Sequence, residues 1–258
     1  MLALSDLTLS YNEEAPVLQG VQLALRSGQF MSLIGPSGCG KSTLLRVIMG
    51  LQKPQQGRVQ LQVPLDEVGF LFQDDALLPW RNARDNVALG LRIQGMSRRQ
   101  ARLQAEAWLQ SVGLAGFEDR YPQQLSGGQR KRVSIAQVLA LQPKLLLMDE
   151  PFASLDAIVR RYMIEDLLHW VAQDEITVLM VTHDLNEAVS VSDRVVLMSN
   201  GPRACIKSEH EIPAVMRASL LEGGVHPEQA RIVAHLWQEL STEIQLPHRQ
   251  QRTITEAA

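Results

Sequence analysis

The chain carries the stretch Gly35-Pro36-Ser37-Gly38-Cys39-Gly40-Lys41-Ser42-Thr43, which satisfies the spacing G-x-x-x-x-G-K-[ST]. A short, mostly apolar run from Phe30 to Ile34 precedes it and is typical of a buried strand. The residues from Lys41 to Gly50 are typical of a helix that ends at a glycine. Glycines let the turn curl until successive backbone N–H groups point inward, and the helix start adds the positive end of its dipole. The sequence therefore predicts a binding site for phosphate groups at this turn.

Two side chains at the end of this turn are suited to a nucleoside triphosphate and its metal ion. Lys41 is predicted to neutralise the β- and γ-phosphates, and the hydroxyl of Ser42 is predicted to bind Mg²⁺. Cys39 is interpreted as a spacer and not as a catalytic thiol. A glycine-rich turn with a chance lysine is the alternative, and it is disfavoured because every fixed position matches between a strand and a helix. The predicted phosphate-binding positions are Gly35, Pro36, Ser37, Gly38, Cys39, Gly40, Lys41, Ser42 and Thr43.

The apolar run from Leu145 to Met148 ends in two acids, Asp149 and Glu150. A buried parallel strand has this pattern, and ligands bind beyond the carboxyl ends of such strands in open α/β sheets. Asp149 is predicted to hold Mg²⁺, directly or through water, and Glu150 to orient or deprotonate the attacking water. An acidic pair that ends a strand is more often a solvated turn when it occurs alone. The phosphate-binding turn in the same chain favours the functional interpretation.

A second candidate anion site is Leu125-Ser126-Gly127-Gly128-Gln129, which the basic run Arg130-Lys131-Arg132 follows. Ser126 is a good helix N-cap, and the two glycines leave the first N–H groups of the helix uncovered. A glycine-containing helix cap with no ligand is the ordinary interpretation when this pattern is seen alone. Two phosphate-binding helix starts with a single lysine-containing turn suggest that two copies of the domain share nucleotides.

Strand and helix patterns alternate along the chain, which predicts an α/β fold with a largely parallel sheet. Near period-two alternation predicts early strands at Leu2–Leu9 and Val21–Leu25. From about Ala83 to Gly113 the pattern turns helical, with Ser97 as a plausible N-cap, and predicts a lobe inserted into the core. The other predicted strands are Gln60–Val63, Val68–Phe72, Lys144–Met148, Ile176–Val181 and Arg194–Met198. One further helix is predicted to begin at Gly127, and others to cover Ala157–Ala172, Leu185–Val191 and Pro227–Leu240.

Composition excludes several classes of protein. The 258 residues are 45% hydrophobic, which is enough for a buried core and ordinary for a globular protein. A net charge of -3 gives no basic field of the kind that binds nucleic acid. Only two cysteines occur, so a secreted disulfide framework is not expected. No signal peptide is expected at the N-terminus, and no apolar run approaches the roughly 18 residues that span a bilayer, so a membrane role would come through a partner.

On these motifs, in this order, the sequence resembles the ATP-binding cassette (ABC) family over roughly residues 1 to 210. Tyr11 matches the family's adenine-stacking aromatic residue, and Gln73 matches the glutamine that touches Mg²⁺ and the attacking water. Ser154-Leu155-Asp156 resembles the loop that crosses the dimer interface, and Asp156 is carried over as a nucleotide-site residue. His183 matches the histidine that contacts the γ-phosphate. Gln137 departs from the arginine that the family often has in the helix after the second candidate anion site.

The resemblance implies a P-loop NTPase core of mainly parallel sheet, with an antiparallel β subdomain and an inserted α-helical subdomain. The expected division is an ATPase domain at residues 1–210, with its helical lobe at about 83–140, and a C-terminal helical extension at 211–258. The polar stretch from His248 onward is expected to fray.

The resemblance also implies a head-to-tail dimer, either of identical chains or with a related ATPase. Each ATP, with Mg²⁺, would lie between Gly35–Thr43 of one copy and the helix start of the other, at Ser126, Gly127, Gly128 and Gln129. Closure would align Glu150 and His183 with the γ-phosphate. The metal ligands implied are Ser42, Gln73 and Asp149, and the catalytic residues implied are Lys41, Gln73, Glu150 and His183.

The segment from Gln73 to Trp80 is expected to dock the permease subunits of a transporter, with Trp80 as an anchor, unless Trp80 only packs the helical lobe. Leu77-Leu78-Pro79-Trp80 looks like the nitrate/sulfonate/taurine branch of ABC importers. That branch implies a small anionic cargo, an extracytoplasmic solute-binding protein, and a peripheral position on the cytoplasmic face of the inner membrane. An exporter or lipid-transport ATPase, and a soluble ABC ATPase acting on DNA or the ribosome, are the alternatives.

Overall fold

The chain folds into two compact units, each assembled from separate stretches of sequence. The computed structural model describes residues 1–11, 15–153 and 155–244. The first unit consists of Met1, Arg26–Gly28 and Gln62–Met180, and the second consists of Leu2–Leu25, Gln29–Leu61 and the chain from Val181 onward. Among the described residues, no helix combines the length and the apolar character needed to span a membrane.

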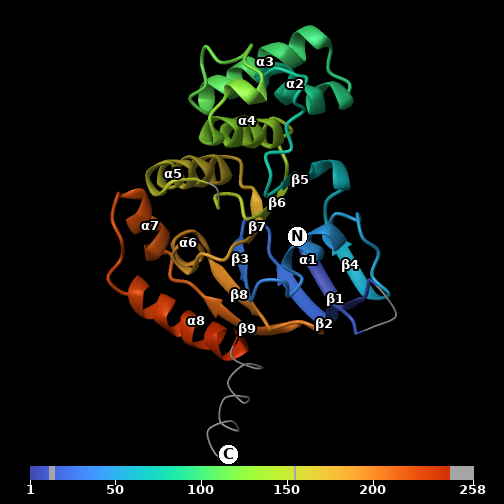
Figure 1. Ribbon diagram of the computed structural model, residues 1–258, viewed down its shortest axis with the longest axis vertical. Helices are drawn as coiled ribbons and strands as arrows, with labels where there is room; N and C mark the ends of the chain where they lie inside the picture. Colours follow the sequence, from blue (N-terminus) through green and yellow to red (C-terminus); the bar gives the residue numbers. More distant parts are fainter. Residues whose placement is uncertain (12–14, 154, 245–258) are drawn as a thin grey trace, which may run out of the picture. The chain divides into compact units, whose positions relative to one another are not determined.

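The second unit contains a three-stranded antiparallel sheet in the order β2-β1-β4 (Figure 1). Its strands are β1 (Leu2–Leu9), β2 (Leu18–Leu25) and β4 (Gln56–Leu61). The buried side chains of β1 and β2 are leucines and one valine, spaced two residues apart except where the pairing shifts register, between Leu4 and Leu7 and between Leu18 and Val21. The prediction of a strand at Gln60–Val63 was partly wrong, because β4 begins four residues earlier, at Gln56. Its early residues are polar and exposed, so the apolar alternation did not mark them.

The second unit also contains the neighbouring strands β3, β8 and β9, and β3 leads directly into the phosphate-binding turn. β3 (Phe30–Ile34) is buried throughout and pairs in parallel with β8 (Arg194–Met198), which pairs antiparallel with β9 (Ile206–Glu211). The helices among the described residues of this unit are α1 (Lys41–Ile48), α6 (Leu185–Val191), α7 (Val215–Leu221) and α8 (Gln229–Ile244). Buried residues of β3, β8, α6, α7 and α8 share one apolar core, which includes Ile34, Leu197 and Leu236.

The first unit combines parallel strands with a cluster of helices. Its strands follow the order β5 (Val68–Leu71), β6 (Leu145–Asp149) and β7 (Thr177–Val181), and β5 pairs in parallel with β6. The 3₁₀ turns η1 (Leu65–Glu67) and η2 (Pro122–Gln124) connect its elements. The long helices are α2 (Ala83–Ile93), α3 (Arg98–Ser111), α4 (Gly127–Leu139) and α5 (Ala157–Gln173).

The predicted helical lobe is present as α2, α3 and α4, which lie side by side (Figure 1). Their apolar faces meet in a core that includes Val87, Leu91, Leu109 and Val133. The predicted N-cap of α3 is confirmed, because the Ser97 hydroxyl accepts a hydrogen bond from the Gln100 N–H at 3.3 Å. The α/β class is confirmed as well, since parallel strand pairs occur together with surrounding helices. The domain limits 1–210 and 211–258 stay a prediction, and the stretch from His248 lies outside the described residues.

Candidate active site

The phosphate-binding turn of the second unit joins β3 to α1, as its strand–turn–helix pattern predicts. Gly40 is the N-cap of α1 and has φ of 100°, in the left-handed region that favours glycine. A Cβ atom at this position would also lie 2.8 Å from Cδ2 of Leu18. Gly38 is left-handed too, with φ of 79°. The turn therefore needs glycine at both positions, and Gly40 brings no side chain that could cover the first N–H groups of the helix.

Lys41 is buried within the turn that it follows. Its Nζ donates hydrogen bonds of 2.8 Å to the carbonyl oxygens of both Gly35 and Pro36. The ammonium group is therefore held over the curl of the turn, beside the backbone N–H groups. Ser42 is half-buried and Thr43 is buried at the start of α1. Lys41 and these two hydroxyl-bearing residues thus lie together at the start of α1, where the phosphate site is predicted.

Tyr11 lies next to the same turn. Its phenol oxygen is 3.0 Å from Oγ1 of Thr43, and the residue as a whole is half exposed. This contact fixes one end of the phenol beside the helix start and leaves ring surface accessible to a flat group such as a nucleobase. Cys39 is fully buried beneath the turn, and burial raises the pKa of its thiol although the charge of Lys41 opposes that effect. A protonated, buried thiol fits the interpretation of Cys39 as a spacer.

His183 belongs to a short loop that is anchored on both sides. The N–H of Thr182 donates to the carbonyl oxygen of Leu33 at 3.3 Å, close to the start of the phosphate-binding turn. The Thr182 hydroxyl is 2.7 Å from Oε2 of the buried Glu187. Asp184 caps α6 by accepting from the N–H groups of Asn186 and Glu187. The exposed imidazole of His183 is thus carried on a rigid loop next to the end of β3.

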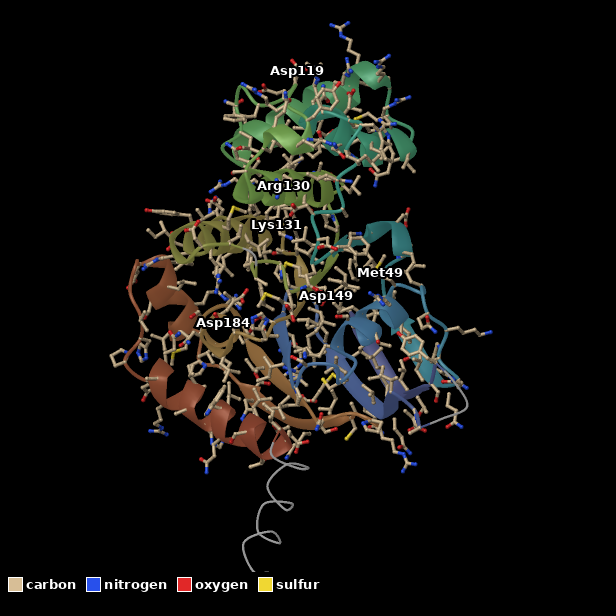
Figure 2. All side chains as sticks on the ribbon, in the orientation of Figure 1. Met49, Asp119, Arg130, Lys131, Asp149 and Asp184 are labelled. Carbon is tan, nitrogen blue, oxygen red and sulfur yellow. The ribbon has the colours of Figure 1, made fainter. Side chains whose placement is uncertain are left out.

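In the first unit, Asp149 is the last residue of β6 (Figure 2), and Glu150 follows it in the sequence. Asp149 is 7% exposed, and the four residues before it on the strand are fully or almost fully buried. Glu150 has φ of 45°, which is uncommon for a residue with a side chain. With this backbone conformation, Glu150 does not continue the alternating side-chain directions of the strand. Strained backbone conformations of this kind cluster at functional sites.

The second predicted anion site begins α4. The Ser126 hydroxyl accepts from the Gln129 N–H at 3.2 Å, and the Gln129 side chain accepts from the Ser126 N–H at 2.9 Å. This reciprocal capping box fixes the helix start, while Gly127 and Gly128 leave its surface bare. Gly128 also permits a close approach, because a Cβ atom there would lie 3.3 Å from Cγ1 of Val159 on α5.

Asp156 has an evident structural role, which sequence reasoning missed. Its Oδ1 accepts from the N–H groups of Ile158 and Val159, at 3.2 and 3.0 Å, and so caps α5. Asp followed by a helical pattern could have indicated this cap. Ser154, in the same predicted interface loop, lies outside the described residues.

Gln73 lies in an exposed loop that a buried lysine fastens to α4. The Lys131 Nζ donates to the carbonyl oxygens of Phe72 and Gln73, both at 3.2 Å, and lies 3.6 Å from Oδ1 of Asp75. Arg130 pairs with the other oxygen of Asp75 at 3.2 Å. A pocket of about 480 Å³ opens here, lined by Gln73, Asp74, Asp75, Arg130 and Ala153. The basic run was visible in the sequence, but its attachment to this loop was not predicted.

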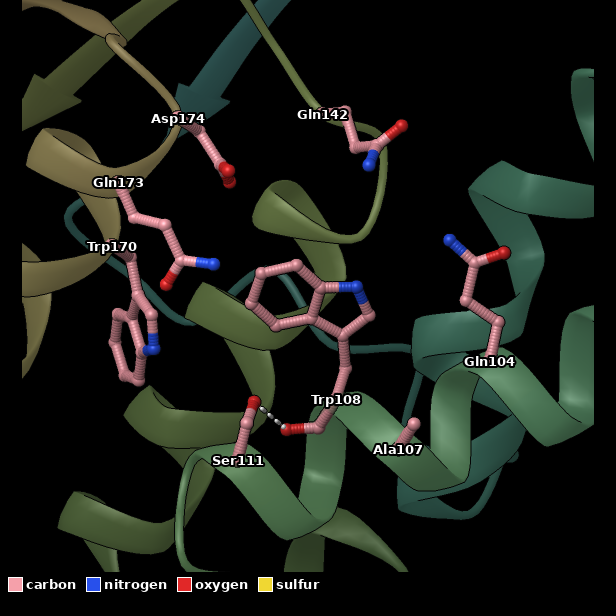
Figure 3. Close-up of a pocket in the computed structure, with 8 residues that line it drawn as sticks. All are labelled: Gln104, Ala107, Trp108, Ser111, Gln142, Trp170, Gln173 and Asp174. Atoms are coloured by element: carbon pink, nitrogen blue, oxygen red, sulfur yellow. Dashed lines mark hydrogen bonds between the residues drawn. The ribbon is translucent and has the colours of Figure 1, made fainter.

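Another pocket of the first unit, of about 330 Å³, holds none of the predicted site residues (Figure 3). The indoles of Trp108 on α3 and Trp170 on α5 face it, together with amide side chains and Asp174. It therefore contributes no group to the predicted phosphate chemistry.

The predicted site residues thus form two sets, one in each unit. The second unit brings together Tyr11, the turn Gly35–Thr43 and the anchored loop of His183. The first unit carries Gln73, the helix start at Ser126–Gln129, Asp149, Glu150 and Asp156. Comparison with known proteins identifies the family: a family model described as ABC transporter matches residues 18–153. The chain belongs to the ABC transporter family.

Individual relatives agree with this assignment. The taurine import ATP-binding protein TauB of Escherichia coli O157:H7 is 47% identical over 207 residues, covering 78% of this chain and 81% of that protein. TauB of Escherichia coli K12 is 46% identical with the same coverage. Among solved structures, the dimeric post-hydrolysis state of the ATP-binding cassette MJ0796 bound to ADP and Pi superposes with a TM-score of 0.74. That match is 33% identical and covers 83% of this chain and 99% of MJ0796.

These matches confirm the P-loop NTPase fold and the enzyme class that the motifs predicted. This chain is an ATP-binding cassette ATPase, which hydrolyses ATP. The roles of its individual site residues remain predictions.

Proposed function

We propose that this ABC ATPase drives a membrane importer whose cargo is a small sulfonate or a related anion of the nitrate, sulfonate and taurine type. The observation that carries the proposal is the 47% identity with a taurine import ATP-binding protein over 78% of the chain. The segment Leu77–Trp80 supports the same branch of importers. The cargo itself never touches an ATPase subunit, so its class rests on the relatives and not on this chain's own site.

Two copies of the cassette are proposed to enclose each nucleotide. The turn Gly35–Thr43 of one copy would bind the phosphates with its backbone N–H groups and Lys41, and Tyr11 would stack on the base. The bare helix start at Ser126–Gln129 of the other copy would close over the γ-phosphate. The dimeric arrangement of the MJ0796 cassette supports this pairing. ATP then favours the closed dimer because its phosphates bind both surfaces at once.

Glu150 and His183 are proposed to act on the closed state. Glu150 would orient the attacking water and accept its proton, and His183 would donate a hydrogen bond to the γ-phosphate as its charge rises. Lys41 would neutralise the developing charge between the β- and γ-phosphates. Loss of the bridging phosphate after hydrolysis lets the two copies separate.

The donor set Ser42, Gln73 and Asp149 suits Mg²⁺, because all three side chains offer oxygen atoms and Mg²⁺ prefers oxygen. Asp149 is a nearly buried carboxylate at the end of β6, and a bound cation would interact favourably with its negative charge. When bound, Mg²⁺ would neutralise phosphate charge during transfer.

The loop after Gln73 is proposed to dock the permease subunits. Trp80 is 71% exposed, so it does not fill the core of the helical lobe, and a large exposed indole is a suitable anchor for a partner helix. Asn86 holds this loop rigid, since its fully buried side chain bonds to backbone groups of Leu78, Arg81 and Asn82. This docking, with an extracytoplasmic solute-binding protein in the full complex, would hold the subunit peripherally on the cytoplasmic face of the membrane.

The variant Glu150→Gln tests the catalytic assignment. We expect it to bind ATP and dimerise but to lose at least about 100-fold in hydrolysis, because amides cannot accept the proton. Glu222→Gln, an exposed glutamate at the end of α7, is the matched control and should retain normal activity. Hydrolysis by Glu150→Gln within a few-fold of the wild type would show that another group is the base.

Transport is tested separately, with the permease that co-purifies with the chain from membranes. In the reconstituted complex with its solute-binding protein, taurine or another sulfonate should stimulate hydrolysis. The solute should also accumulate on the side of the membrane that carries the ATPase subunits. Stimulation by a solute that moves outward, or by a lipid, would instead assign the chain to an exporter.

A further inference from the structure

A second group of chemically active side chains lies where α8 packs beside β9, in the second unit (Figure 1). It consists of His210 on β9 and of His235 and Glu239 on α8. One ligand atom from each side chain can be chosen so that all three atoms lie within 4.8 Å of one another. None of these residues belongs to the nucleotide motifs.

Local structure explains why the three side chains meet. His235 and Glu239 are four residues apart on α8, so they occupy the same face of the helix. His210 and Ser208 are two residues apart on β9, so both point to the same side of the strand. The adjacent residues Leu236 and Leu240 are buried in the apolar core, which fixes the rotation of α8 against the strand.

The distances resemble those within a metal coordination shell. Nε2 of His210 lies 3.2 Å from Oε2 of Glu239, and Nε2 of His235 lies 3.1 Å from Oε1 of the same carboxylate. Zinc–ligand bonds of about 2.0–2.2 Å in a tetrahedron place neighbouring ligand atoms about 3.3–3.6 Å apart. The two imidazoles therefore present Nε2 to opposite oxygens of one carboxylate at nearly this separation. Since three ligand atoms, one from each side chain, lie within 4.8 Å of one another, small side-chain rotations would bring all three around one ion.

We propose that His210, His235 and Glu239 bind a divalent transition-metal ion, with zinc as the ion best matched. Two imidazole nitrogens and one carboxylate oxygen form a borderline-soft set that suits zinc, whereas magnesium and calcium prefer oxygen alone. The ion would bind the lone pair of each Nε2 and one oxygen of the carboxylate.

The surroundings support a site of this kind. The Ser208 hydroxyl donates to Oε2 of Glu239 at 2.6 Å, and hydrogen bonds to a ligating carboxylate hold it in position. The side chains of His210 and Glu239 are 21% and 24% exposed, whereas that of His235 is 60% exposed. The site is thus closed on the protein side and open toward His235, where an ion can enter and water can complete the shell.

Metal binding would fasten the C-terminal helix to β9. The same two elements are already linked by the ion pair between Lys207 and Glu243, whose carboxylate also accepts from the N–H of Asn200 at 2.9 Å. A metal ion that binds only the folded arrangement stabilises it by mass action.

The test uses the untagged full chain, freed of metal by a chelator and kept without nucleotide. Zn²⁺ is titrated against a chromophoric chelator, and X-ray absorption then reports the ligand atoms. We expect one ion per chain at this site, with two imidazole nitrogens and an oxygen among its ligands. In His235→Ala the affinity should fall at least about tenfold, and Zn²⁺ should raise the thermal midpoint of the wild type but not of this variant.

His169→Ala is the matched control, because His169 is another exposed histidine on a long helix. It should bind Zn²⁺ as the wild type does. Glu239→Gln should also weaken binding, but its loss could disturb α8, whereas the exposed His235 can be removed without a change in circular dichroism. Equal Zn²⁺ affinity in folded His235→Ala and wild type, or no binding at micromolar Zn²⁺, would overturn the proposal.

Discussion

The Nζ atom of Lys131 lies 3.2 Å from the carbonyl oxygen of Gln73. The same ammonium donates to Phe72 and approaches Asp75, and only 1% of its side chain is exposed. Lys131 belongs to α4, the helix that begins with the candidate anion site at Ser126. A single buried cation therefore ties that helix to the loop proposed to face both the nucleotide and the permease.

Replacing this lysine should loosen the loop. Lys131→Met leaves the carbonyl oxygens of Phe72 and Gln73 without their donor, and we expect the free energy of unfolding to fall by about 1–3 kcal/mol. We also expect the coupling of permease and hydrolysis to weaken. Urea unfolding and solute-stimulated hydrolysis measure the two effects. Lys144→Met is the control, because Lys144 pairs with Glu67 at an exposed position, where a loss below about 1 kcal/mol is expected.

Burial also makes the contribution of Lys131 depend on pH. Desolvation lowers its pKa below the ordinary value of 10.5, although the charge of Asp75 opposes this. Between the lowered pKa and 10.5, the unfolded chain binds more protons than the folded one, so stability rises with pH. The difference in unfolding free energy between wild type and Lys131→Met should therefore grow as the pH rises toward 10.5. A difference that stays constant or shrinks over this range would contradict the assigned pKa shift.

Local pattern was sufficient to predict much of the fold, including β3, α6 and β8 at their observed limits. It failed for β9 and α7. Ile206–Glu211 alternates half-buried and exposed residues, mostly polar, and a strand of this kind at the end of a sheet carries little apolar signal. Val215–Leu221 is a short helix with one buried residue, Met216, so its periodicity is weak.

The nucleotide motifs could be found in the sequence because their chemistry depends on fixed local spacing. Contacts between residues that are far apart in the sequence could not be found in this way. The contact of Tyr11 with Thr43, the attachment of Lys131 to Gln73 and the convergence of His210 on Glu239 join residues that lie 29 or more positions apart. Such contacts follow from how the elements pack, which no short pattern specifies.

Two serine N-caps, Ser126 of α4 and Ser97 of α3, allow the effect of a lost cap on stability to be separated from an effect on ATP hydrolysis. Ser126→Ala removes the acceptor for the Gln129 N–H and should lower the free energy of unfolding by about 1 kcal/mol. Ser97→Ala removes the equivalent N-cap of α3 and should cost about the same. Only Ser126→Ala should impair hydrolysis and ATP-dependent dimerisation, since α3 carries no candidate anion site. Equal activity in the two variants would remove Ser126 from the nucleotide site.

Asn86 provides a test of the docking loop. Its Oδ1 accepts from the Leu78 N–H at 2.8 Å, and its Nδ2 donates to the carbonyl oxygens of Leu78, Arg81 and Asn82. Asn86→Ala removes these four side-chain hydrogen bonds, while the carbonyl oxygens of Leu78 and Asn82 keep their bonds from other backbone N–H groups. The loss should cost about 1–3 kcal/mol of stability. Pull-down with the permease should weaken, while hydrolysis by the isolated subunit should stay within a few-fold of normal. Trp80→Ala should weaken the same pull-down with little effect on stability, because the indole is exposed.

Cys39 and Cys205 should differ in reactivity, because the phosphate-binding turn buries Cys39. Cys39 is fully buried, and burial raises the pKa of its thiol, so it stays protonated at neutral pH; Cys205 is half-buried. Only the thiolate attacks iodoacetamide, so at pH 7.5 native Cys39 should be modified more slowly than Cys205, as mass spectrometry can follow. In urea both should react at similar rates, because the burial that separates them is lost. Cys39→Ala should hydrolyse ATP within a few-fold of the wild type, whereas rapid native modification of Cys39 would mean that the turn opens far more often than its hydrogen bonds imply.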